Sequence, residues 1–214
     1  MSRCRLALPW LLVPALAGAA PETWHFDTMH TQIAFAVDHL GFARALGLVK
    51  VKDGEVRFDA ADWSTAAVTV DIDLATLGMG DAPWEDTVRS WRFLNTRRWP
   101  LATFRGHRVE RTGPADGVIH GELELHGTRQ PVDLTFHMNR LGNDPYTLRR
   151  TAGFSARTTL KRSAFGMDRL LSAVGDEVEL RIEVELQRGA GRRSAAPSAG
   201  RDDPRGETDD EPAQ

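Results

Sequence analysis

Residues 177–186 read EVELRIEVEL, ten positions in which charged and apolar side chains alternate without interruption. The valines, leucines and isoleucine at the even positions share one face, and the glutamates and the arginine share the other. An α-helix needs apolar residues three and four apart, whereas a period of two is typical of a β-strand with one buried face. This stretch therefore predicts a half-buried strand.

The same alternation recurs through most of the chain. It is clearest at residues 68–74, 119–125 and 132–138, and it predicts further strands at 32–37, 47–51, 55–59, 102–109 and 151–160. Turn signals rich in glycine, proline, asparagine and aspartate separate the strands at 53–54, 113–117, 127 and 142–145. About eight or nine antiparallel strands are expected.

Strands with one polar and one apolar face must bring their apolar faces together, out of contact with water. A sandwich of two sheets does this, and so does a closed barrel, which also removes exposed sheet edges. The pattern of residues alone leaves these two all-β architectures open.

One segment departs from the period of two. Trp84, Val88 and Trp91 are spaced as one stripe of a short helix, with Asp81 as its expected N-cap and Pro83 in its first turn. We expect this helix to plug one end of the sheet with its two tryptophans. The alternative is a lid over a cavity.

The two ends of the chain differ from the body. Residues 1–20 have two early arginines, an apolar stretch of about 11 residues and small residues at 17–20, which is the layout of a secretory signal peptide. Residues 189–214 contain no aromatic side chain and no Val, Ile, Leu or Met, which predicts a disordered polar tail. The expected folded domain is 21–188, located in the periplasm or secreted, with no stable membrane anchor after signal cleavage.

Composition excludes several classes of function. The net charge is −3, with 27 basic and 30 acidic residues and no basic block, which argues against a nucleic-acid partner. Cys4 is the single cysteine and lies in the predicted leader, so the body has no disulfide, thiolate metal site or catalytic thiol. The seven histidines lack metal-binding spacing, and no nucleophile elbow, Walker loop or dinucleotide loop is present. We expect no metal and no cofactor.

Short motifs along nearly the whole body resemble the YceI-like family of bacterial secreted proteins. They are DTMHT at 27–31, VDHLG at 37–41, GEVRFD at 54–59, Arg89-Ser90 with Phe93, Pro100 and Phe104, GELELHG at 121–127 with Pro131-Val132, RSAFGM at 162–167 and GDEV at 175–178. The resemblance implies a lipocalin-like antiparallel barrel of about eight strands with an elongated apolar tunnel. It also implies that the tunnel holds a polyisoprenoid chain, such as a quinone tail, without catalysis.

The sequence departs from the family pattern at 84–88. The family usually has an Arg-Asp pair followed by a His-Leu pair before Arg89-Ser90, whereas this chain reads WEDTV. The helix is therefore more apolar here, and contacts to the polar head of a ligand are expected to differ.

The main functional hypothesis is a non-catalytic binding protein for an isoprenoid-type lipid. The expected apolar lining, with the three helix-stripe residues near its mouth or end, is Phe26, Ile33, Phe35, Val70, Ile72, Trp84, Val88, Trp91, Leu123, Leu125, Phe136, Phe154 and Leu180. One alternative is an enzyme for a lipidic or quinone-like substrate that uses His25, His30 or His39 as acid–base groups. Another is a fully packed structural or interaction module, and a homodimer is left open.

Overall fold

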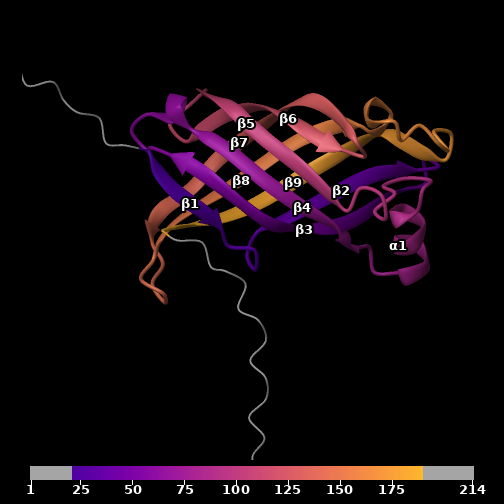
Figure 1. The fold of residues 1–214 in the computed structure, drawn as a ribbon, viewed down its shortest axis with the longest axis horizontal. Coiled ribbons are helices and arrows are strands. Elements are labelled where there is room, and N and C mark those ends of the chain that lie inside the picture. The colour runs from indigo at the N-terminus through magenta and orange to yellow at the C-terminus, as the bar shows by residue number, and fades with distance from the viewer. Residues whose placement is uncertain (1–20, 190–214) are drawn as a thin grey trace, which may run out of the picture.

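Antiparallel strands form the wall of a closed barrel in the computed structural model, which describes residues 21–189 (Figure 1). The strands are β1 (Glu22–Phe26), β2 (Gln32–His39), β3 (Ala43–Phe58), β4 (Ala67–Gly78), β5 (Leu101–Arg111), β6 (Asp116–Leu125), β7 (Thr128–Asn143), β8 (Arg150–Lys161) and β9 (Val174–Arg188). The helical segments are η1 (Trp63–Thr65), α1 (Ala82–Arg89) and η2 (Arg162–Phe165). The predicted leader and polar tail lie outside the described residues.

The nine strands occupy eight positions in the ring. In β1, Trp24 lies opposite Val56 of β3 and Arg188 of β9. In β2, Ile33 lies opposite residues of the same two strands, Val49 and Ile182. Because β1 and β2 both run antiparallel to β3 and β9, they fill one position in succession, and residues 27–31 interrupt it.

Pairing of β3 with β4 completes the ring and leaves the apolar faces inside. The predicted antiparallel barrel of about eight strands with a short helix near one end is confirmed, and the sandwich alternative is wrong. The closed barrel is favoured over a sandwich with free edges because each long strand then has hydrogen-bonded neighbours on both sides.

The Asp53-Gly54 turn predicted between two short strands does not occur. β3 runs without a break through both residues, and a β-bulge shifts its register to β4 between Val51 and Asp53. A Cβ at Gly54 would come within 2.7 Å of the Phe26 ring, so this glycine is required for close packing. Sequence reasoning also missed β1, whose five residues are too few for a clear alternation.

Helix α1 begins as predicted, because Asp81 Oδ1 accepts a hydrogen bond from the Trp84 amide at 2.9 Å. Glu85 then accepts a hydrogen bond from the Met79 amide at 2.7 Å and pairs with Arg89 at 2.7 Å. The helix ends at Arg89, before Trp91. Trp84 and Trp91 remain 40% and 58% exposed, so the prediction that this helix plugs one end of the sheet with its two tryptophans was wrong.

The connection between β8 and β9 is held by one buried arginine. Arg162 is 4% exposed, and its guanidinium donates hydrogen bonds to the carbonyls of Met167, Val174 and Gly175. Burial lowers its pKa, and the charges of Asp176 and Asp168 oppose that change. Arg162 therefore fixes the loop at the α1 end of the barrel.

We predict that Arg162→Met destabilises the protein far more than Arg105→Met, which changes an exposed arginine on β5. Each buried carbonyl left without a donor costs about 1–3 kcal/mol, so we expect a loss of at least about 3 kcal/mol. Urea unfolding of the two variants measures it. Equal, small losses in both would contradict the clamp.

Candidate functional site

A cavity of about 480 Å³ runs inside the barrel. All nine strands contribute inward side chains to its wall, together with residues from α1, η2 and the loops beside them. Binding pockets for small molecules commonly have volumes of about 300–1,000 Å³. The interior therefore has room for a ligand, and the alternative of a fully packed interior is wrong.

The wall of this cavity is almost entirely apolar. Its only charged or titratable members among the described residues are Asp38, His39 and Arg162, all near the α1 end. Asp38 Oδ2 accepts a hydrogen bond from the Gly41 amide at 3.0 Å, and Arg162 is bonded to backbone carbonyls. Such a surface suits a hydrocarbon, because a polar ligand would lose its hydrogen bonds to water without replacement.

The expected lining residues converge on this cavity, with one exception. Those that line it are Phe26, Ile33, Phe35, Val70, Ile72, Trp84, Val88, Leu123, Leu125, Phe136, Phe154 and Leu180. Trp91 does not: it follows the end of α1 and is 58% exposed. The period of two succeeded on the strands because closure turns every apolar face inward.

Sequence reasoning missed lining residues in the segments beside α1 and in the β8–β9 connection. Met79, Phe93, Phe165, Met167 and Leu170 come from the segments before and after α1 and from the β8–β9 connection. Irregular segments have no period, so no local pattern assigns their side chains to the interior. The motif RSAFGM at 162–167 was the only signal close to three of them.

The two ends of the cavity differ. At the end away from α1, Trp63 of η1 is 4% exposed and covers the interior. Its ring centroid lies 6.1 Å from that of Phe58 and 5.5 Å from that of Phe136, and the Arg111 guanidinium lies 4.6 Å from it. At the α1 end, Trp84 and Leu170 belong both to the cavity wall and to the exposed surface. The cavity therefore opens beside α1.

The three histidines of the enzyme alternative do not meet. His25 lies opposite Gln187, near the C-terminal end of β9, whereas His39 lies opposite Val174, at its start. His39 borders the mouth, with its ring 6.1 Å from that of Trp84. His30 lies in the loop between β1 and β2 and does not border the cavity. The cluster that this alternative requires inside the cavity is not formed by the residues it named.

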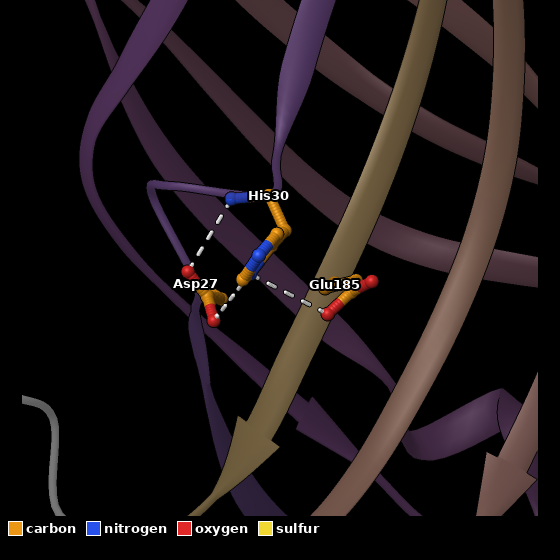
Figure 2. Close-up of side chains that lie close together, drawn as sticks. All are labelled: Asp27, His30 and Glu185. Atoms are coloured by element: carbon orange, nitrogen blue, oxygen red, sulfur yellow. Dashed lines mark hydrogen bonds and ion pairs between the residues drawn. The ribbon is translucent and has the colours of Figure 1, made fainter. Parts of the chain in front are cut away.

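His30 belongs instead to a surface cluster with Asp27 and Glu185 (Figure 2). One potential metal-ligand atom from each lies within 4.8 Å of the others. Both oxygens of Asp27 already accept hydrogen bonds, Oδ1 from the Met29 amide at 3.0 Å and Oδ2 from Gln187 at 2.8 Å. We therefore interpret the cluster as a link that fixes the interrupted strand to β9.

Hydrogen bonding shifts two pKa values in this cluster. The pKa of His30 is raised, first by its hydrogen bond to Asp27, at 3.0 Å, and then by the charge of that carboxylate. Burial alone would raise the pKa of Asp27, but the hydrogen bonds from His30 and the Met29 amide hold it below its ordinary value. The charged pair is thus favoured in the folded state.

We predict that His30→Gln removes a pH-dependent part of the stability. The contribution of His30 is fully present below the ordinary histidine pKa of about 6.5 and is lost as pH rises through the raised pKa. The side chain is 57% exposed, so the difference from the parent should be at most about 1 kcal/mol.

Thermal unfolding at pH 5.5 and pH 9 measures this effect. The two proteins should differ more at the lower pH, whereas His107→Gln, an exposed histidine on β5, should leave the profile unchanged. A constant difference between parent and His30→Gln at both pH values would show that the ion pair contributes nothing.

Within residues 21–189, no helix has both the length and the hydropathy needed to cross a membrane. Helix α1, the longest of the helical segments, has eight residues.

Comparison with known proteins finds a matching family model and similar bacterial proteins. The family model of the YceI-like domain matches residues 24–186. A "UPF0312 protein" of Shewanella baltica is 34% identical over 175 residues, which cover 82% of this chain and 91% of the relative. A "UPF0312 protein" of Shewanella oneidensis is 33% identical with the same coverage.

Solved structures share the fold at lower identity. BcnA of Burkholderia cenocepacia superposes with a TM-score of 0.67 and 22% identity over 75% of this chain and 98% of its own. A structure from Saccharophagus degradans, described as a polyisoprenoid binding domain, has a TM-score of 0.61 and 13% identity over 79% of this chain and 99% of its own. These likenesses are of fold, since such identities do not carry function across.

Proposed function

The chain belongs to the YceI-like family, and from this premise we propose that it is a non-catalytic binding protein for an isoprenoid-type lipid. The barrel interior would hold the apolar chain of a quinone or a polyprenol. The layout of residues 1–20 supports a periplasmic or secreted location for this activity. The single observation that carries the proposal is the apolar cavity inside the ring of strands.

The volume of the cavity supports a slender ligand. A methylene group occupies a volume similar to that of a water molecule, about 30 Å³ in a liquid, so 480 Å³ holds on the order of 16 carbons. This corresponds to roughly three isoprene units. At about 0.8 kcal/mol for each buried methylene, their burial amounts to roughly 12 kcal/mol before ordering costs, enough for micromolar binding. A longer chain would extend beyond the mouth.

The choice of an isoprenoid over another lipid is supported by fold analogy. The neighbour from Saccharophagus degradans is described as a polyisoprenoid binding domain and has the same barrel. The apolar wall of this chain fits a branched hydrocarbon, and aromatic rings at Phe35, Phe104 and Phe136 offer flat surfaces to its methyl groups.

The residues of the cavity wall near the mouth favour a ligand whose head has few hydrogen-bonding groups. Where the family usually has arginine and histidine, this chain has Trp84 and Thr87, both in the cavity wall. Thr87 Oγ1 already donates to the Pro83 carbonyl at 3.0 Å. Arg162 donates hydrogen bonds to backbone carbonyls. Within the cavity wall, a quinone or an alcohol head therefore fits better than a diphosphate.

The direct test is to purify the protein from its native host, extract it with organic solvent and analyse the extract by mass spectrometry. We expect a series of masses spaced by isoprene units, and we expect the emptied protein to bind farnesol. A protein that is always empty and also refuses farnesol and added quinone would refute the proposal.

A substitution that fills the cavity should block binding. Ala156 lines the cavity on β8, whereas Thr159 on the same strand is exposed. We predict that Ala156→Trp, by displacing about four methylene groups of ligand, weakens farnesol binding by on the order of 100-fold. Thr159→Trp should bind like the parent. Titration calorimetry measures both, and equal affinities would show that farnesol binds elsewhere.

A further inference from the structure

Exposed apolar side chains gather around the mouth of the cavity. Of the eleven large hydrophobic residues that are exposed in the described part of the chain, six lie on the segments around the opening. We call these six the mouth rim: Leu40, Phe42, Trp84, Trp91, Leu170 and Leu171. Phe42, at the tip of the β2–β3 hairpin, is 89% exposed. Exposed apolar groups concentrated in this way mark an interaction surface.

Contacts between the segments show that the mouth rim belongs to one end of the barrel. The Leu40 amide donates to the Ala173 carbonyl at 2.8 Å, which joins the β2–β3 hairpin to the β8–β9 connection. The His39 ring lies 6.1 Å from that of Trp84, which joins the hairpin to α1. In Figure 1 these segments lie together at the right end of the barrel.

Positive charge accompanies the mouth rim. The guanidinium of Arg169 lies 4.4 Å from the centroid of the Trp91 ring, and that of Arg92 lies 5.8 Å from it. Neither arginine forms an ion pair within residues 21–189, whereas Glu85 and Asp86 of α1 are paired with Arg89. Two exposed arginines, neither with an acidic partner among the described residues, therefore flank an exposed tryptophan.

The apolar surface of the mouth rim continues into the cavity. Trp84 and Leu170 belong to both, so no polar belt separates the outer surface from the interior. A ligand that left through this opening into water would lose about 0.8 kcal/mol for every methylene exposed. A ligand that passed from this opening into another apolar phase would not pay that penalty.

We propose that the mouth rim docks on the surface of a bilayer that contains anionic phospholipids, so that the ligand moves directly between the bilayer and the cavity. The ligand exchange rests on the proposed function, but the docking itself does not require it. Phenylalanine and leucine insert below the head groups, tryptophan prefers the interface, and the guanidinium groups bind lipid phosphates. A bilayer also accepts apolar tips from separate loops, which need no shaped partner.

Vesicle co-sedimentation at low salt tests the docking. The protein should bind vesicles of phosphatidylglycerol and phosphatidylcholine, and should bind pure phosphatidylcholine more weakly. Each arginine near an anionic surface contributes about fivefold in affinity, so Arg92→Gln/Arg169→Gln should weaken binding by on the order of 25-fold. The matched control Arg57→Gln/Arg105→Gln changes exposed arginines on β3 and β5 and should have little effect.

A second pair of variants tests the apolar contact. Phe42→Ser/Leu171→Ser changes two mouth-rim residues that do not line the cavity and should lower vesicle binding at least tenfold. Met29→Ser/Tyr146→Ser removes two exposed apolar side chains away from the mouth and should bind vesicles like the parent. All proteins carry the same chain ends, so any difference between them comes from the substituted positions.

Farnesol binding in solution separates the two proposals. Phe42→Ser/Leu171→Ser and Arg92→Gln/Arg169→Gln should keep the parent affinity for farnesol while their affinity for vesicles falls. If they bind vesicles as well as the parent does, or if the control variants lose as much, the docking proposal is wrong whatever the farnesol result. If farnesol fails to bind but the mouth rim still selects anionic vesicles, the docking stands and the proposed ligand is wrong.

Discussion

The rest of the structure depends on the closure of eight antiparallel strand positions around inward side chains that are nearly all apolar. Closure gives every position in the ring two hydrogen-bonded neighbours and removes the sheet edges. The diameter of such a ring is set by strand number and stagger, and side chains at this size leave only a narrow interior. In this chain the interior is incompletely filled, and the result is an apolar cavity of about 480 Å³ rather than a solid core.

The two ends of that cavity are built differently, and the difference gives the barrel a direction. One end is covered by Trp63, which is packed between aromatic rings and an arginine. The other is bordered by α1 and by the loop that Arg162 holds in place. Access to the interior is therefore bordered by α1 and this loop, whereas the ring itself is held together by the hydrogen bonds between neighbouring strands.

Sequence patterns predicted the barrel wall well because one simple rule governs it. The alternation at 177–186 and at 119–125 assigns each side chain to a face, and a closed ring makes every apolar face an interior face. The choice between sandwich and barrel could not be made this way, since both bury the same faces. The predicted turn at Asp53-Gly54 was wrong because glycine also occurs where packing is close, and here the Phe26 ring lies against Gly54. The helical spacing predicted Trp84 near the mouth or end, but Leu170 could not be derived, because it lies in a segment whose placement depends on contacts distant in the sequence.

The central claim is that an apolar chain occupies the interior of the ring. A crystal structure of the protein purified from its native host tests it most directly. We predict continuous, water-free density that runs from Trp63 toward Trp84, with the bends of an isoprenoid. A chain of ordered water molecules hydrogen-bonded along the same path, or side chains collapsed into the space, would contradict it.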